Sequence, residues 1–154
     1  MNIFIRKALI NDSESINSFN KAMALETENL TLNEAIAKNG VQNLFNNPNY
    51  GYYIVAEIDA VVVGQLMITY EWSDWRNGLF LWIQSVYVLP EFRNKGIYRK
   101  LYNYVLDESK KNSNVCGIRL YVDKNNKNAR EVYTKLGMEE SDYTMYETDF
   151  VIKR

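Results

Sequence analysis

One stretch decides the fold: residues 86–101, which read VYVLPEFRNKGIYRKL. An apolar strand enters a short basic turn with Gly96, and a pattern of helical period follows. Helix N-termini present unpaired backbone N–H groups and the positive end of the dipole, so such a turn suits a phosphate. The stretch lacks the glycines of a dinucleotide fingerprint and the Gly-Lys pair of a P-loop. On these residues alone, a purely structural turn remains the alternative.

Upstream of this stretch, the sequence predicts strands at residues 3–8, 51–57 and 61–70. Together with the strand at 79–89, the last two form an antiparallel meander. Two helices are expected between the first two strands, one from Asp12 or Ser13 and one from the capping box 31–34. Residues 26–28 would then lie in the loop between these helices, and residues 71–78 in a connection between strands.

Downstream, the helix from Gly96 precedes a strand at 117–122, an order that suggests a right-handed parallel crossover. Asn126 can cap a short helix that ends at Gly137. Residues from Tyr143 onward alternate in polarity, which predicts one or two closing strands. We therefore expect a single α/β domain over residues 1–154, with a mixed, mostly antiparallel sheet of six or seven strands flanked by four helices.

The composition excludes several kinds of active site. The 154 residues include no histidine and one cysteine, Cys116. A Ser-His-Asp or Cys-His nucleophilic site, His-ligated zinc, an internal disulfide and a Cys-rich metal site are therefore ruled out. We expect no metal. An enzyme of this composition must use carboxylates, hydroxyls, backbone amides or a borrowed cofactor.

The overall charge gives no sign of a nucleic-acid or membrane partner. Eighteen basic and nineteen acidic residues leave a net charge of −1. The N-terminus has no apolar segment of signal-peptide length, and no apolar run approaches the ~18 residues that a membrane span needs. We expect a cytoplasmic protein that binds neither nucleic acid nor membranes.

Two segments resemble the GNAT N-acetyltransferase superfamily. Residues 93–98 resemble its acetyl-CoA-binding motif, Q/R-x-x-G-x-G/A, although Tyr98 stands where the family usually has Gly or Ala. Residues 126–138, NKNAREVYTKLGM, resemble the family's N-x-x-A-x-x-x-Y-x-x-x-G-F/M segment. The order of expected strands and helices also matches the GNAT fold along nearly the whole chain.

The resemblance implies acetyl-CoA as the co-substrate. The backbone of Val86, Tyr87 and Val88 would pair with the pantetheine arm as if it were an added strand. Asn126 would bind the pantetheine or, equally, only cap its own helix. The pyrophosphate would be held by backbone amides and basic side chains of the turn: Arg93, Asn94, Lys95, Gly96, Ile97, Tyr98 and Arg99.

The resemblance also implies direct acetyl transfer to a primary amine of a small molecule or peptide through a tetrahedral intermediate. A backbone N–H near Val88 would stabilise the oxyanion. Tyr133 would lie near the thioester sulfur and protonate the departing thiolate, core packing being its alternative role. For the whole protein, the alternative is a non-catalytic acyl-CoA-binding module.

The general base is the open question, because no histidine can supply it. Some family members use a glutamate on the fourth strand, but the matching position here is Trp82. Gln84 lies on the same face and can position a water without removing a proton itself. The carboxylates that remain as candidate bases are Glu71, Asp74, Glu26 and Glu28.

Four residues are candidates for holding a cationic acceptor. Glu26 and Glu28 lie in a stretch of sequence, residues 22–37, that contains no basic residue, near the expected acceptor side, with ordinary solvated charge as the alternative. Trp72 and Asp74 belong to an aromatic connection that can form a cation–π wall. The same connection can instead pack across a homodimer surface or cover the sheet edge.

Overall fold

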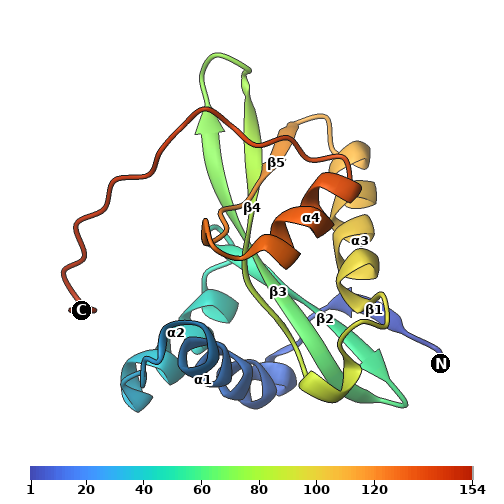
Figure 1. Ribbon diagram of the computed structural model, residues 1–154, viewed down its shortest axis with the longest axis vertical. Coiled ribbons are helices and arrows are strands. Elements are labelled where there is room, and N and C mark those ends of the chain that lie inside the picture. Colours follow the sequence, from blue (N-terminus) through green and yellow to red (C-terminus); the bar gives the residue numbers. More distant parts are fainter. Residues whose placement is uncertain (154) are drawn as a thin grey trace. The chain divides into compact units, whose positions relative to one another are not determined.

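The computed structural model describes residues 1–153 and divides them into two compact units, Met1–Tyr121 and the residues from Val122 onward (Figure 1). The first unit holds a single mixed sheet whose strand order follows the chain. Neighbouring strands are antiparallel except for β4 and β5, which are parallel. The strands are β1 (Phe4–Lys7), β2 (Gly51–Ile58), β3 (Val61–Ser73), β4 (Gly78–Val88) and β5 (Val115–Arg119).

Helices cover both faces of this sheet. The first unit contains α1 (Ser13–Glu28), α2 (Glu34–Asn46) and α3 (Ile97–Lys111), and the second contains α4 (Lys127–Lys135). Helices α1 and α2 pack on the face that carries Tyr53 and Val55, where Ile16 is fully buried. Gly64 points to the opposite face, and α3 lies there with Ile97 beside it. No helix within the described residues is long and apolar enough to cross a membrane.

The prediction of four helices and a mixed sheet is confirmed, but the strand count is wrong. The described residues form five strands, not six or seven, because residues 139–153 contain no strand. The alternating side chains of Tyr143, Tyr146 and Phe150 are all more than three quarters exposed. An alternating pattern stabilises a strand only where one of its faces is buried.

The hairpin between β3 and β4 is longer than the sequence pattern indicates. Strand β3 continues through Ser73, so Glu71 and Trp72 lie in a strand and only residues 74–77 form the turn. Because residues 71 and 73 are polar, the hydrophobicity pattern does not indicate a strand here, but Glu71 pairs opposite Phe80 of β4. Cross-strand pairing therefore outweighs the local composition.

Two helix boundaries also differ from expectation. Helix α1 extends to Glu28, so residues 26–28 form its last turn and not a loop. Helix α2 is capped by Asn33, whose Oδ1 accepts a hydrogen bond from the Ile36 N–H at 3.0 Å, and not by the expected box beginning at Thr31. Glu34, the acidic member of that box, pairs with Lys21 of α1 at 3.0 Å. Asn33 therefore supplies the local cap of α2, and Glu34 takes part in an ion pair between the two helices.

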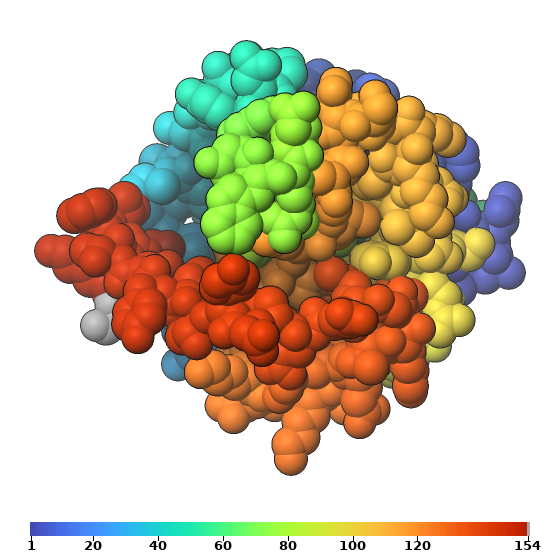
Figure 2. All heavy atoms as spheres, turned by 90° about the horizontal axis from the view of Figure 1, so that it is seen from above, coloured from blue at the N-terminus to red at the C-terminus, as the bar shows by residue number. Residues whose placement is uncertain are grey.

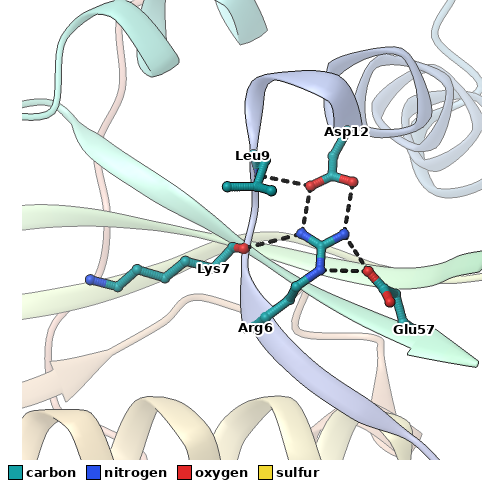
Figure 3. Close-up of polar contacts among 5 residues, drawn as sticks. All are labelled: Arg6, Lys7, Leu9, Asp12 and Glu57. Carbon is teal, nitrogen blue, oxygen red and sulfur yellow. Dashed lines mark hydrogen bonds and ion pairs between the residues drawn. The ribbon is translucent and has the colours of Figure 1, made fainter. Parts of the chain in front are cut away.

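A cluster of charged side chains joins β1, β2 and the start of α1 (Figure 3). Arg6 of β1 forms a two-pronged contact with Asp12, at 2.7 and 3.0 Å, and also pairs with Glu57 of β2. Asp12 accepts a further hydrogen bond from the Leu9 N–H at 2.7 Å. Asp12 stands at the N-cap position of α1 but makes no side-chain cap bond, because its carboxylate accepts hydrogen bonds from Arg6 and the Leu9 N–H.

Candidate active site

The turn before α3 leaves the N-terminus of that helix without a side-chain cap. Gly96 occupies the N-cap position with φ 78°, and no acidic residue lies in the first turn. By contrast, α2 and α4 are each capped by an asparagine side chain, Asn33 and Asn126. Asn94 is also left-handed, with φ 61°. The first N–H groups of α3 have no intrahelical acceptors, so this end of the helix suits an anion.

The strand that leads into this turn has one free edge. Strand β5 pairs only with Leu79–Trp82 of β4, so no described strand of Met1–Tyr121 pairs with Val86–Val88 on that side. Toward β3, the register slips: Gln65 faces Tyr87, whereas Met67 faces Gln84. Strand β4 therefore holds one extra residue there, a β-bulge. Ser85, within the bulge, has φ 51°.

Arg93 links the turn to α1. Its Nη2 pairs with Glu26 Oε2 at 2.8 Å, and its Nε donates to the Val88 carbonyl at 2.8 Å. The guanidinium also lies 5.3 Å from the ring centre of Tyr87, whose hydroxyl donates to Glu26 at 3.1 Å. These contacts bring a residue predicted for the acceptor, Glu26, together with three predicted for the cofactor.

The same contacts shift two pKa values. The hydrogen bond from Arg93 lowers the pKa of Glu26, with the Tyr87 hydroxyl adding to the effect. Burial, and then the neighbouring Glu26 carboxylate, raises the pKa of Tyr87. Glu26 is therefore a charged, weakly basic carboxylate whose first partner is Arg93, in the turn before α3.

The other residues of the turn are mostly exposed. The ammonium group of Lys95 lies 5.3 Å from the ring centre of Phe92, and Arg99 is exposed on the first turn of α3. Tyr98 is half-buried, with its ring 6.5 Å from that of Tyr102. Its bulky side chain therefore packs along α3, next to the following turn of the helix.

Beyond the bulge, one face of the sheet carries a polar and aromatic cluster. Glu71 of β3 pairs with Arg119 of β5 at 2.9 Å and accepts a hydrogen bond from Trp82 Nε1 at 2.8 Å. The Trp82 hydrogen bond, followed by that of Arg119, lowers the pKa of Glu71. The Arg119 guanidinium lies 3.6 Å from the ring centre of Phe80.

Gln84 belongs to the same cluster. Its Nε2 donates to the Thr69 hydroxyl, and its Oε1 accepts from the Tyr121 hydroxyl at 3.5 Å. The Tyr121 ring lies 5.2 Å from the ring of Trp82. Gln84 is therefore held in place from both sides. Gln84 is the last residue of β4 paired with β3 before the bulge, so this cluster lies next to the segment that carries the free edge of β4.

The tip of the β3–β4 hairpin is exposed, as Figure 2 shows for the light green segment. Trp72 is 60% and Trp75 86% exposed. The carboxylate of Asp74 accepts a hydrogen bond from the Trp75 N–H within the turn itself. Glu28, the last residue of α1, is exposed as well. Among the hydrogen bonds given above, none links Trp72 or Asp74 to Glu26 or Glu71.

In the second unit, the expected cap is confirmed. Asn126 Oδ1 accepts from the Ala129 N–H at 3.1 Å, at the N-terminus of α4. Tyr133 is half-buried on this helix, and Gly137 follows it with φ 89°. Arg130 joins α4 to the following segment through Glu140, at 2.7 Å.

Several residues of this site escaped prediction. Arg119, Tyr121 and Thr69 lie on strands or strand ends that read as plain sheet, and Gln65 is a fully buried polar residue in an apolar strand. A charged or amide side chain inside an apolar strand is the signal that could have found Arg119 and Gln65. Within residues 1–153, no group of three or more His, Cys, Asp or Glu side chains is arranged to hold a metal ion.

An uncapped helix beside a bulged strand with a free edge suits a phosphate-bearing, strand-like ligand. The chain belongs to the acetyltransferase (GNAT) family, whose model matches residues 16–138. No curated protein sequence matches the chain.

Solved structures give the same result. A "possible acetyltransferase" from Clostridium difficile 630 is 46% identical, with a TM-score of 0.90 and coverage of 99% of this chain and 100% of that one. A "predicted acetyltransferase" from Clostridium acetobutylicum, solved with acetyl-CoA, is 21% identical (TM-score 0.77, 96% of each chain). An aminoglycoside acetyltransferase from an uncultured soil metagenomic sample, in complex with sisomicin, is 20% identical (TM-score 0.76, 95% of each chain). The last two likenesses concern the fold.

Proposed function

We propose that this protein transfers an acetyl group from acetyl-CoA directly to a primary amine of a small molecule or peptide. The observation that carries the proposal is the uncapped N-terminus of α3, beside the free edge of β4, in a chain of the GNAT family. An acyltransferase of this kind needs neither histidine nor metal, because the thioester arrives already activated.

The residues present fit acetyl-CoA. A pyrophosphate would accept hydrogen bonds from backbone N–H groups around Gly96 and Ile97, where the helix dipole favours negative charge. Lys95 and Arg99 are exposed beside this point and add positive charge. No described strand of Met1–Tyr121 pairs with Val86–Val88 on the β5 side, so the amides of a pantetheine arm can use this edge of β4 as a strand partner.

The reaction would form a C–N bond and break a C–S bond. The backbone N–H near Val88 would donate to the carbonyl oxygen as negative charge develops there. Tyr133 would give its proton to the departing sulfur, and Asn126 would bind the pantetheine or cap α4 alone. The amine would lose its proton through a water beside Gln84, with Glu71 as the candidate acceptor.

The acceptor itself is proposed only by class. One solved structure of similar fold is described as an aminoglycoside acetyltransferase bound to sisomicin, and another as a ribosomal-protein-alanine N-acetyltransferase. A third is a complex with the bisubstrate analogue CoA-S-monomethyl-acetylneamine. Both small-molecule and peptide amines therefore belong in the test. Glu26, Glu28, Trp72 and Asp74 are the residues we propose around a cationic acceptor.

One experiment tests the proposal most directly. Release of free thiol from acetyl-CoA is measured against polyamines, aminoglycosides, amino acids and peptide N-termini. Tyr133→Phe should lower kcat by about a hundredfold while the Kd for CoA is retained, since it removes only the proton donor. Tyr143→Phe, at an exposed tyrosine of the same unit, is the matched control and should leave kcat unchanged.

A second candidate function is a non-catalytic acyl-CoA-binding module. Two of the proposed site carboxylates, Glu26 and Glu71, each pair with an arginine, which makes both weak bases. Tight CoA binding without thiol release for any amine of the panel would favour the module over the enzyme.

A further inference from the structure

Gln65 is the most deeply buried polar side chain of the sheet. It lies in the middle of β3 and is 0% exposed. Its Nε2 donates to the carbonyl of Ser85 at 3.2 Å and to Asn20 Oδ1 at 2.8 Å, while its Oε1 has no hydrogen-bond partner among the described residues. Burying an amide with one unsatisfied oxygen is costly. Such a residue calls for a specific role, which its donor contacts indicate.

Both contacts of Gln65 lead to the bulge of β4. The register slip between β3 and β4 begins at Gln65 itself, which faces Tyr87, and the extra residue follows Gln84. Ser85 is left-handed without being a glycine, a conformation that costs free energy and persists only where surrounding contacts fix it. Ser85 has no partner in the register between β3 and β4, and its carbonyl accepts a hydrogen bond from the Gln65 amide.

Helix α1 orients the Gln65 amide. Asn20, on the sheet-facing side of α1, accepts from Gln65 Nε2 and is also hydrogen-bonded to the side chain of Tyr53. The chain of contacts therefore runs from α1 through Asn20 and Gln65 to the Ser85 carbonyl. These contacts hold the bulge from the face of the sheet that α1 covers, and the free edge of β4 takes no part in them.

We propose that Gln65 is a positioning residue for the acyl-CoA site. By holding the Ser85 carbonyl, it keeps β4 bulged, so that the backbone of Val86–Val88 stays aligned to pair with a pantetheine arm. The inference rests on the proposed function of the site, but the bulge itself can be tested without any ligand.

The test replaces the amide with an apolar side chain of similar length, Gln65→Met. Amide hydrogen exchange is measured in the ligand-free protein, and the Kd for CoA by calorimetry. Without the donor, the bulge should open more often, so exchange at residues 85–88 should be about tenfold faster and CoA binding about tenfold weaker. Exchange in the core of α3 should stay as in the wild type.

Asn17→Leu is the matched control. Asn17 is also a buried amide of α1 with an unpartnered oxygen, but its Nδ2 faces Glu34 and not the bulge. This variant should leave both the exchange at 85–88 and the Kd for CoA within twofold of the wild type. Asn20→Ala removes the hydrogen-bond partner that α1 gives to Gln65. It should speed the exchange at residues 85–88 and weaken CoA binding by about threefold each. If Gln65→Met does not fold, Asn20→Ala is the variant that tests the inference.

The outcomes separate the inference from the proposed function. Wild-type exchange at 85–88 in both Gln65→Met and Asn20→Ala would overturn the role of Gln65, and so would equal effects of Asn17→Leu. Faster exchange in a protein that never binds CoA would support the bulge contact while contradicting the proposed function.

Discussion

At the scale of single residues, the site is organised by arginines that hold carboxylates. Arg93 holds Glu26, and Arg119 holds Glu71. Each pair joins elements that are distant in sequence, α1 with the turn after β4 and β3 with β5. The two acidic residues are therefore structural supports of the turn before α3 (the proposed cofactor turn) and of the sheet face, in addition to any role toward an acceptor.

The Glu26 pair carries the first prediction. Glu26→Ala removes a partner that holds the Arg93 side chain, so the cofactor turn should be less well positioned. Both side chains are 41% exposed, which limits the effect to about two- to fivefold in the Kd for CoA, measured by calorimetry. Glu26→Gln keeps an acceptor for Arg93 and should recover most of the affinity.

Glu14→Ala is the control for this charge change. Glu14 is an exposed acidic residue in the first turn of the same helix. If Glu14→Ala weakens CoA binding as much as Glu26→Ala does, the effect comes from net charge and the pair has no positioning role.

At the scale of elements, the sequence patterns were sufficient for most helices and strands but not for their irregularities. The strand, basic turn and helix around residues 86–101 were predicted because periodicity and Gly96 both mark them. The bulge was not, because Ser85 adopts a positive φ without the glycine that usually signals one. The contact that we propose holds it, from Gln65 to the Ser85 carbonyl, joins residues 20 apart in sequence, and no local pattern reveals that pairing.

The candidate site divides in the same way. The cofactor turn follows from a motif that is contiguous in the chain. The pairing of Glu71 with Arg119 and of Glu26 with Arg93 depends on tertiary contacts across 48 and 67 residues of sequence. Ion pairs between residues so distant in sequence produce no periodic pattern in the sequence, so the pairing of these charges could not be predicted.

Gly96 provides the prediction for the element that we propose binds phosphate. A Cβ at this position would meet nothing within 4 Å, but the residue has φ 78°. Gly96→Ala should therefore cost about 1–2 kcal/mol in strain without a clash. Relief of that strain would move the turn, so we expect a lower Tm and weaker CoA binding, measured by thermal denaturation and calorimetry.

Gly40→Ala is the matched substitution in α2. Its Cβ also meets nothing within 4 Å, and its φ is not positive. Alanine favours the helix interior, so this variant should gain up to about 1 kcal/mol and leave CoA binding unchanged. Unchanged CoA affinity in Gly96→Ala would contradict the phosphate role of the turn.

At the scale of the whole molecule, the absence of histidine shapes the response to pH. No side chain with an ordinary pKa near 6.5 is present, so the free energy of unfolding should change little between about pH 5.5 and 7.5. Loss of stability on acidification must then come from carboxylates whose pKa is lowered in the folded protein. The most buried of those with a lowered pKa is Asp12, held by Arg6 in the cluster that joins β1, β2 and α1.

Asp12 therefore dominates the last prediction. The hydrogen bonds from Arg6, more than any other contact, lower its pKa from the ordinary 3.8. A lowered folded-state pKa means that the unfolded chain binds more protons, so this contribution is complete above the ordinary value and is lost as pH falls through the folded value. Asp12→Asn should cost about 2 kcal/mol at pH 7, because it removes the charge that Arg6 binds.

The decisive quantity is the difference in the free energy of unfolding between the wild type and Asp12→Asn, measured by urea denaturation from pH 7 to pH 2.5. It should be constant down to about pH 5 and shrink below that, because acid removes from the wild type the charge that the variant already lacks. Asp59→Asn, an equal change of charge in the exposed turn between β2 and β3, should be nearly neutral throughout. A gap between wild type and Asp12→Asn that stays constant to pH 2.5 would show that the cluster stabilises the fold through packing and not through the ionised carboxylate.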